Sequence, residues 1–347
     1  NYWYKIDCVV KTLTIDKNKK DTSDSKDSND FKNGDPALVG KESSVKPVDK
    51  MIDKKITMKD LKASDPRWCT GCGDYTILVG MRKFMVDNQL LPENTVHVSG
   101  IGCSGRVPHY LNTYGFHSIH GRAVPLSMGV VLSRPDLNVF IHSGDGDSLS
   151  IGGNHLLHGI HKNFHCVYLM FDNQIYGLTK QQTSPTSRQG LVTQTQPTGS
   201  YLEPINPIKF ALGLGASFVA STAEWMGAHL VATIDCAFKH PGFSFIHVAQ
   251  RCPKFNPSAW NYQGSDWVTF LTHEAGVAAD LKFAPDAKTI SHDPFDSDAA
   301  FKYAAHTPNI FGVFYKEEKP VYNQIMYDVV KNAPRCDRSN LLDGYLI

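Results

Sequence analysis

Two groups of polar residues within the stretch 138–180 have the types and spacing to bind a metal ion together with a phosphate. The first is Gly-Asp-Gly-Asp at residues 144–147, and the second contains Asn173. Glycines allow a phosphate to approach the backbone closely, and carboxylate and amide oxygens are suitable ligands for Mg²⁺. Ile175 follows at a point where its backbone carbonyl could complete a set of oxygen ligands. These residues predict a Mg²⁺–diphosphate site, although Gly-Asp-Gly alone is equally typical of an ordinary turn between a strand and a helix.

Two short apolar runs precede these polar groups and are predicted to be buried parallel strands. The runs at residues 139–142 and 166–171 are rich in β-branched and aromatic side chains. Residues 149–163, which lie between them, are long enough to cross over as a helix. Consecutive strands joined in this way place their carboxyl ends side by side, where open α/β sheets bind ligands. We therefore expect Asp145 and Asn173 at one edge of the sheet.

The remaining pattern predicts an α/β fold, with a doubly wound, mostly parallel sheet and helices on both faces. A helix is expected from about Tyr75, because apolar residues recur on one face as far as Met85. Later segments alternate between the two types of element: helix 126–132, strand 218–220, helix 224–238 and strand 242–249.

Composition divides the chain into three parts. Residues 1–60 are polar, with nearly balanced charge, and are expected to form an extended or disordered arm because they cannot bury enough apolar surface. Residues 61–260 are expected to form the α/β domain. Residues 261–347 are expected to form an extension that packs on this domain or on a partner, with an apolar run at 310–314 and a helix candidate at 321–331.

The overall charge gives no reason to expect nucleic acid or an anionic membrane as a partner, because the 347 residues carry a formal net charge of +1. No apolar run approaches the roughly 20 residues that a membrane helix needs. The amino end lacks the basic and apolar regions of a secretory signal, so we expect a cytoplasmic protein. A charged content of 20% is slightly low for a freely soluble monomer, which fits a surface partly covered by a partner.

Eight cysteines are too sparse for a disulfide scaffold in a chain of this length and indicate a metal or redox site. Cys69 and Cys72 form a Cys-x-x-Cys pair in a glycine-containing loop, which is half of a metal site. A zinc ribbon would repeat this pair, and the sequence does not repeat it, so the other ligands have to come singly. Cys103 and Cys252 are the candidates, because each lies just after a predicted strand. Two further cysteines lie inside apolar segments, as core cysteines do: Cys166 and Cys236.

Two other segments have polar residues near the predicted ligand edge. Arg122 precedes a helix that contains small residues, where it could contact an oxyanion or a phosphate, and a surface arginine is an equal alternative. The loop at residues 181–188 is polar, and loops at this end of a sheet usually carry binding residues.

Several short motifs follow one another in an order that is itself specific. They are Trp-Cys-Thr-Gly-Cys-Gly (68–73), Gly-Ile-Gly-Cys-Ser-Gly-Arg (100–106), Ile-His-Gly-Arg-Ala (119–123), Gly-Asp-Gly-Asp (144–147), Ile-Gly-Gly-Asn-His (151–155), Asp-Asn-Gln-Ile-Tyr-Gly-Leu-Thr-Lys (172–180) and Ser-Pro-Thr (184–186). Over roughly residues 62–330, the chain resembles the thiamine diphosphate-binding β subunits of 2-oxoacid:ferredoxin oxidoreductases, most of all those of the 2-oxoglutarate type.

The resemblance implies two cofactor sites in this chain. Asp145 and Asn173 would bind Mg²⁺ through their side chains and Ile175 through its backbone, and the metal would hold the diphosphate of thiamine diphosphate. Thiolates are suited to iron–sulfur ligation, and the ligands implied for a [4Fe–4S] cluster are Cys69, Cys72, Cys103 and Cys252. Further cofactor contacts are implied at Gly102, Cys103, Gly121, Arg122, Gly144, Gly146, Asp147, Tyr176, Gly177, Leu178 and Thr179. Catalytic roles are implied at Arg106, His120 and Lys180.

The reaction implied by the resemblance is the coenzyme A-dependent oxidative decarboxylation of a 2-oxoacid to acyl-CoA and CO₂, with electrons passing through the cluster to ferredoxin. An α subunit is implied as the partner, with the active site at the subunit interface. The favoured substrate is 2-oxoglutarate, because Arg106 and Lys180 would offer positive charge to its two carboxylates. Gln181 departs from the family pattern, which commonly has glycine there, and a larger residue at this position is expected to stiffen or reshape the substrate-side loop.

Three alternatives remain at the level of the sequence. The enzyme could act on pyruvate or on 2-oxoacids broadly. A non-redox thiamine diphosphate decarboxylase or synthase would need the diphosphate motif but no set of four cysteines. A binding module could hold a structural zinc ion on the same cysteines.

Overall fold

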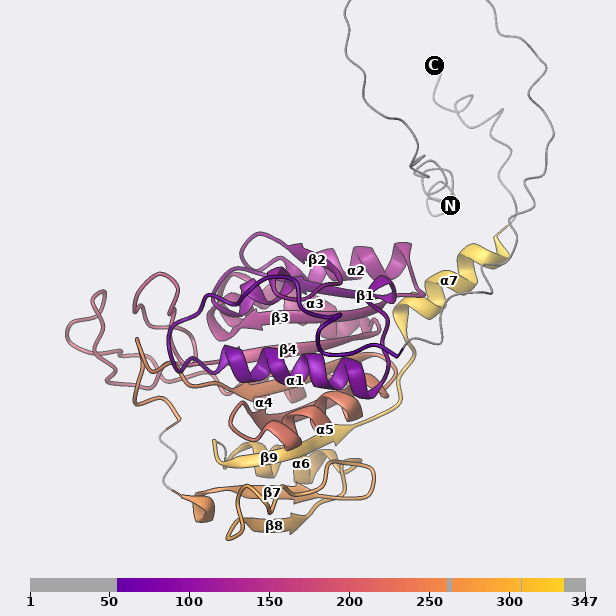
Figure 1. Ribbon diagram of the computed structural model, residues 1–347. Helices are drawn as coiled ribbons and strands as arrows, with labels where there is room; N and C mark the ends of the chain where they lie inside the picture. Colours follow the sequence, from indigo (N-terminus) through magenta and orange to yellow (C-terminus); the bar gives the residue numbers. More distant parts are fainter. Residues whose placement is uncertain (1–54, 261–263, 307, 334–347) are drawn as a thin grey trace, which may run out of the picture. The chain divides into compact units, whose positions relative to one another are not determined.

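The sheet that the sequence predicts forms the centre of the structure. The computed structural model describes residues 55–260, 264–306 and 308–333, and Ile56–Ala333 form one compact unit (Figure 1). Residues 1–54, which make up most of the predicted amino-terminal arm, lie outside the described residues.

Within the described residues, nine strands form one sheet. Their order across the sheet is β2 (Tyr114–His117), β1 (Thr95–Ser99), β3 (Asn138–Gly144), β4 (Cys166–Asp172), β6 (Phe243–Ala249), β5 (Phe218–Ala223), β9 (Ile310–Lys316), β7 (Thr269–Thr272) and β8 (Lys288–Ser291). The strands from β2 to β5 in this order run parallel, β9 is antiparallel to β5, and β7 is parallel to β9 and β8. The prediction of a doubly wound, mostly parallel sheet is confirmed.

Helices cover both faces of this sheet because its central strands are buried on both sides. Along β4, Tyr168 and Met170 pack into the core of one face, and Val167 and Leu169 pack into the core of the other. Two helices pack on the face that contains Val167 and Leu169: α1 (Asp74–Asp87) and α5 (Gly227–Phe238) (Figure 1). Five helices contribute to the core on the face that contains Tyr168 and Met170: α2 (Ala123–Ser133), α3 (Gly153–Lys162), α4 (Pro207–Gly213), α6 (Ser297–Ala304) and, through Tyr322, α7 (Tyr322–Asn332). The prediction of helices on both faces is therefore also confirmed.

The crossover between β3 and β4 differs from the single helix predicted at residues 149–163. It begins with a π-helical turn, η5 (Asp147–Ile151), and α3 starts only at Gly153. Gly152 lies between them, and a Cβ atom there would clash with the carbonyl oxygen of Asp147. This wide first turn leaves Asp147 and Ser148 buried next to the end of β3.

The region after residue 260 contributes directly to the sheet. The sequence places an extension there, and the structure adds β7, β8 and β9 from it to the sheet. The apolar run at 310–314 is the first part of β9, and the helix candidate at 321–331 corresponds to α7. The division of the chain at residues 60 and 260 stays a prediction.

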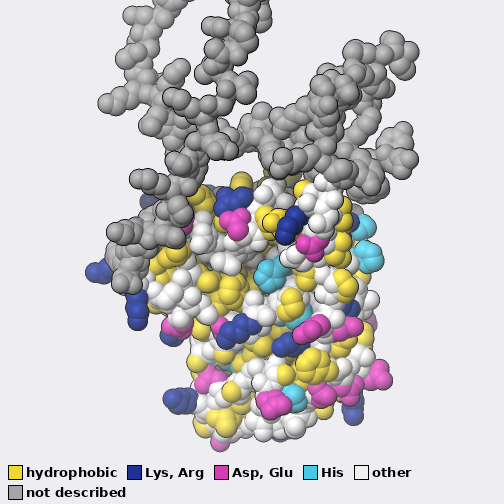
Figure 2. Space-filling view, turned by 90° about the vertical axis from the view of Figure 1, so that its right-hand side faces the viewer, with side chains coloured by type: hydrophobic (Ala, Val, Ile, Leu, Met, Phe, Trp, Pro, Cys, Tyr) yellow, Lys and Arg dark blue, Asp and Glu magenta, His cyan; other side chains and the backbone are white. Residues whose placement is uncertain are grey.

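The surface is mixed in charge on the face seen in Figure 2, where acidic and basic side chains alternate among apolar ones. Among residues 55–260, 264–306 and 308–333, no helix combines the length and the apolar character needed to cross a membrane.

Candidate functional site

Four parallel strands end at one edge of the sheet, and the segments that follow them carry most of the predicted site residues. β1 leads into the loop with Cys103, β3 into Asp145, β4 into Asn173, and β6 into Cys252. These strands are neighbours in the order β1-β3-β4-β6, so their carboxyl ends lie next to one another. The crossover argument from the sequence therefore gives the correct edge of the sheet.

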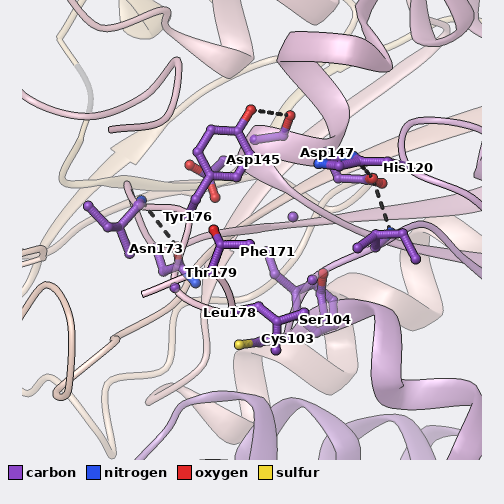
Figure 3. Close-up of a pocket in the computed structure, with 16 residues that line it drawn as sticks. Cys103, Ser104, His120, Asp145, Asp147, Phe171, Asn173, Tyr176, Leu178 and Thr179 are labelled. Carbon is purple, nitrogen blue, oxygen red and sulfur yellow. Dashed lines mark hydrogen bonds and ion pairs between the residues drawn. The ribbon is translucent and has the colours of Figure 1, made fainter. Parts of the chain in front are cut away.

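One cavity at this edge brings together most of the residues expected to contact cofactor or metal (Figure 3). The predicted residues that line it are Gly102, Cys103, His120, Gly144, Asp145, Gly146, Asp147, Asn173, Ile175, Tyr176, Gly177, Leu178 and Thr179. Figure 3 shows Asp145 and Tyr176 toward one end and Cys103 and Leu178 toward the other. Three lining residues were not predicted, and they adjoin predicted ones: Ile101, Ser104 and Phe171.

Asp145 is a buried carboxylate with two hydroxyl partners, Ser184 and Thr186. Thr186 Oγ1 lies 2.7 Å from Asp145 Oδ2 and 2.8 Å from Asp172 Oδ1. Because a hydroxyl has only one proton to donate, it cannot satisfy both carboxylates at once. Burial, followed by the charge of Asp172, raises the pKa of Asp145 to about 7. Such a carboxylate is suited to a cation, which would replace the proton and relieve the repulsion.

Asn173 and Ile175 are fixed by a turn directly after β4. The backbone N–H of Ile175 donates to Asn173 Oδ1 at 3.2 Å, and Asn173 Nδ2 donates to Gln250 Oε1 at 2.9 Å. With both ends of its amide engaged, the buried Asn173 side chain has one orientation. A carboxylate, an amide oxygen and a nearby backbone carbonyl are the donor set that a hard divalent cation prefers, so the residues present fit Mg²⁺.

Asp147 connects the loops that enclose the cavity. Its Oδ1 atom accepts hydrogen bonds from the backbone N–H of Ile101 at 3.1 Å and of Gly121 at 2.7 Å. His120 Nδ1 lies 2.6 Å from the same oxygen, an ion pair when the imidazole is protonated. Gly100 is required beside it, because a Cβ atom there would clash with the Asp147 carboxylate. Asp147 therefore orients His120 at the cavity wall.

Tyr176 packs directly on the glycine turn after β3. Its hydroxyl donates to the carbonyl oxygen of Gly146 at 3.1 Å, and burial raises its pKa. A Cβ atom on Gly146 would clash with the Tyr176 ring, so this position needs glycine. The contact joins the Gly-Asp-Gly-Asp turn to the loop that continues to Lys180.

The four predicted cluster ligands line a second cavity, of about 210 Å³. They are Cys69, Cys72, Cys103 and Cys252. Burial raises the pKa of Cys103 to about 12, with smaller contributions from Asp74, Cys252 and Cys69, and burial also raises the pKa of Cys72 and Cys252. Thiols in such surroundings become thiolates when a cationic metal group binds them.

The two cysteines that were predicted to lie in the core are not among the residues that line this cavity. Cys166 is buried in the core of one sheet face, and Cys236 packs at the edge of the other. Among the described residues, no three Cys, His, Asp or Glu side chains converge closely enough for a single metal ion. A [4Fe–4S] cluster binds each thiolate at a separate iron, so four thiols around a cavity are the donor set that fits it.

The remaining predicted residues lie around these two cavities. Arg106 and Lys180 line the cavity of the four cysteines, and an Arg106 N–H donates to the carbonyl oxygen of Arg67 at 2.6 Å. Arg122 lies at the start of α2, where its guanidinium donates to the carbonyl oxygen of His120 at 3.2 Å. Gly121 has a φ of +70°, which allows the sharp turn between them.

Several residues that organise the site were not assigned a role from the sequence. Thr186 and Gln250 bridge groups from different strand ends, and His247 Nε2 lies 2.9 Å from Asp172 Oδ2. Thr186 belongs to the Ser-Pro-Thr motif, and Asp172 belongs to the motif that ends at Lys180. The motifs therefore marked these two positions but did not indicate what the side chains do. For Gln250 and His247, no local pattern marks a role.

Comparison with known proteins agrees with this geometry. Residues 100–248 match the family described as "Thiamine pyrophosphate enzyme, C-terminal TPP binding domain". This stretch contains Cys103, the turns that carry Asp145 and Asn173, and the loop to Lys180. The thiamine diphosphate-binding domain expected from the sequence is thereby confirmed.

Individual proteins with related sequences are also found. The chain is 49% identical over 195 residues to 2-oxoglutarate oxidoreductase subunit KorB of Mycobacterium tuberculosis, covering 56% of this chain and 52% of that protein. It is 38% identical over 211 residues to 2-oxoglutarate synthase subunit KorB of Methanocaldococcus jannaschii, covering 59% of this chain and 76% of that protein. The chain thus spans about half the length of the first of these relatives.

A solved structure is similar to this chain over a larger part of its length. It is described as 2-oxoglutarate:ferredoxin oxidoreductase from Magnetococcus marinus with 2-oxoglutarate, coenzyme A and succinyl-CoA bound. The similarity has a TM-score of 0.75 and a sequence identity of 31%, and it covers 85% of this chain and 97% of that one. Together with the ordered motifs and the shared edge of the sheet, these similarities show that the chain belongs to the β subunits of the 2-oxoacid:ferredoxin oxidoreductases.

Proposed function

We propose that this chain is the β subunit of an enzyme that oxidatively decarboxylates a 2-oxoacid with coenzyme A and passes the electrons to ferredoxin. The observation that carries the proposal is the contact between the two cavities. The cavity with Asp145 and the cavity with the four cysteines share Cys103, Asn173, Gly177 and Leu178 in their walls. A redox group in one cavity would therefore adjoin a thiamine diphosphate in the other.

In this proposal, the chain's own residues bind and orient two cofactors. Asp145, Asn173 and the backbone of Ile175 hold Mg²⁺ and with it the diphosphate of thiamine diphosphate, and Tyr176 and Thr179 close the cavity above the glycine turn. Cys69, Cys72, Cys103 and Cys252 hold a [4Fe–4S] cluster. Thiamine diphosphate supplies the carbon–carbon bond cleavage when it is bound, and the cluster supplies a one-electron acceptor.

The substrate side of the proposal rests on basic residues beside the cofactor cavity. An open cavity of about 600 Å³ shares Gly102 and Leu178 with it and is lined by Arg67, Arg106 and His117. Arginine is well suited to bind carboxylates through paired hydrogen bonds. We propose 2-oxoglutarate as the substrate, which the names of the M. tuberculosis and M. jannaschii relatives support.

A second candidate is an enzyme that accepts 2-oxoacids broadly. It is favoured by relatives such as the 2-oxoacid:ferredoxin oxidoreductase subunit β of Saccharolobus solfataricus, which is 39% identical over 201 residues and whose name specifies no single acid. In both cases an α subunit completes the active site. The cytoplasmic location expected from the sequence stays a prediction.

The test is anaerobic co-purification of the chain with its α subunit, followed by viologen reduction across a panel of 2-oxoacids with coenzyme A. We expect reduction that requires coenzyme A and is fastest with 2-oxoglutarate. Similar rates with pyruvate and 2-oxobutyrate would favour the broad enzyme. CO₂ release without viologen reduction would contradict the redox function and support a non-redox decarboxylase.

A further inference from the structure

Gln250 is a buried amide that connects the two proposed cofactor sites. It follows β6 directly, and its side chain is almost fully enclosed, with 1% of the residue exposed. Its Oε1 atom accepts a hydrogen bond from Asn173 Nδ2 at 2.9 Å. Its Nε2 atom donates to Cys72 Sγ at 3.4 Å and to the carbonyl oxygen of Arg251 at 2.8 Å. One side chain therefore touches a proposed metal ligand and a proposed cluster ligand.

The surroundings hold this amide in place. The backbone N–H of Gln250 donates to the carbonyl oxygen of Asp172 at 2.9 Å, which continues the pairing of β6 with β4. Gly73 packs against the side chain, and a Cβ atom there would lie 3.0 Å from Gln250 Cγ and 2.7 Å from Glu224 Cγ. Because Gln250 Oε1 faces the Asn173 amide, its N–H groups are left for the sulfur and the Arg251 carbonyl.

Each of the two bonds has a chemical consequence for the group it reaches. The bond to Asn173 Nδ2 fixes which way the Asn173 amide points, so that Oδ1 remains the atom that faces the backbone N–H of Ile175. The bond to Cys72 Sγ places an N–H dipole on a thiolate ligand. Hydrogen bonds to the sulfur atoms help set the reduction potential of an iron–sulfur cluster, and a donor stabilises the more negative, reduced state.

We propose that Gln250 is a positioning residue that couples the two sites, orienting Asn173 toward the metal–diphosphate end and raising the reduction potential of the cluster through Cys72. This inference rests on the proposed function, since it requires both cofactors in this chain. It assigns Gln250 no contact with substrate.

Two substitutions separate the two bonds. Gln250→Leu removes both. Gln250→Glu has nearly the same shape and keeps an acceptor for Asn173 Nδ2, but at pH 8 it places a carboxylate in front of Cys72 Sγ in place of a donor. Gln89→Leu is the matched control, because Gln89 is exposed and its side chain contacts Ile56 and Val86.

The measurements use the anaerobically purified complex with its α subunit. The potential of the cluster is measured by redox titration followed by electron paramagnetic resonance, and thiamine diphosphate binding at limiting Mg²⁺ is measured by calorimetry. We expect a more negative potential in both Gln250 variants and roughly 10-fold weaker cofactor binding only in Gln250→Leu. Gln89→Leu is expected to match the wild type in both measurements.

The outcomes distinguish this inference from the proposed function. Wild-type potentials in both Gln250 variants would overturn the inference while leaving the cluster itself in place. Equally weakened cofactor binding in Gln250→Glu and Gln250→Leu would overturn the role assigned to the Asn173 bond. A wild-type complex that contains no iron–sulfur cluster would instead contradict the proposed function.

Discussion

At the scale of single residues, we expect the hydroxyl of Thr186 to have a large effect on cofactor binding. It lies within hydrogen-bonding distance of both Asp145 and Asp172, whose negative charges repel each other in a buried site. Hydrogen-bond partners of metal ligands commonly contribute 10- to 100-fold to metal affinity. Thr186 thus extends the proposed Mg²⁺ site beyond its direct ligands.

We predict that Thr186→Val binds thiamine diphosphate roughly 10-fold more weakly in the presence of Mg²⁺, because Asp145 loses one of the two hydroxyl donors that fix its carboxylate. Thr186→Ser keeps a hydroxyl and should retain most of the affinity. Isothermal titration calorimetry measures both. Equal affinities for the valine variant and the wild type would show that Thr186 does not support the metal site.

The second residue-scale prediction concerns the departure from the family at Gln181. Lys180 and Gln181 have φ values of +70° and +78°, a region that glycine adopts at little cost and other residues rarely adopt. The glycine common in the family matches this backbone, and Gln181 holds the same turn under strain. We expect Gln181→Gly to raise the free energy of unfolding by about 1 kcal/mol, measured by chemical denaturation.

The control for this prediction is Gln189→Gly. Gln189 is exposed in the same loop region and does not have a positive φ, so glycine there adds flexibility without relieving strain. An equal loss of stability in both variants would contradict the strain at Gln181.

At the scale of elements, histidines are buried where strands and helices pack. His142 in β3 and His229 in α5 are enclosed, and burial lowers the pKa of His142 to about 3 and that of His229 to about 4. The unfolded chain binds protons on these groups below about pH 6.5, and the folded chain does not. The contribution of these two histidines to stability is therefore fully present above pH 6.5 and is lost as the pH falls toward 4.

We predict that His229→Gln removes one contribution to the pH dependence, so that between pH 6.5 and pH 4 the slope of the free energy of unfolding against pH changes by up to about 1.4 kcal/mol per pH unit. His161→Gln is the matched control, because His161 is exposed on α3. Urea denaturation at several pH values measures the slopes. An unchanged slope in His229→Gln would show that His229 is protonated in the folded chain.

The elements that the sequence predicted well share a strong local signal. β3, β4 and β6 each contain a short run of apolar residues, and their order along the chain gave the correct edge for the site. β2 was missed because its four residues, Tyr-Gly-Phe-His, are too few to distinguish a strand from a loop, and all four are exposed. β7 and β8, with four residues each, are too short to be distinguished from loops.

The sequence predicted those site residues that lie in local motifs or directly after predicted strands. Asp145, Asn173 and the four cysteines lie in local motifs or directly after strands, and the structure places them on two adjoining cavities. The roles of Thr186 and Gln250 depend on tertiary partners, 41 residues away at Asp145 and 77 residues away at Asn173. Only the folded sheet brings such partners together, so no spacing rule could have assigned them.

At the scale of the whole molecule, the fold places the proposed diphosphate-binding turn and a set of thiols at the same edge of one sheet. This arrangement explains why both cofactors are proposed in one chain. The α subunit would then complete the active site over the carboxyl ends of the strands. The central claim is therefore that the four cysteines around the second cavity hold a [4Fe–4S] cluster.

The most direct test is the iron and acid-labile sulfide content of the anaerobically purified complex, compared between Cys252→Ser and Cys236→Ser. Cys252 lines the cavity of the four cysteines, whereas Cys236 packs at the edge of the core between α5 and the sheet. We predict roughly four iron atoms per chain in the wild type and in Cys236→Ser, and a marked loss of iron in Cys252→Ser. A wild-type complex without iron, or equal iron loss in both variants, would contradict the account.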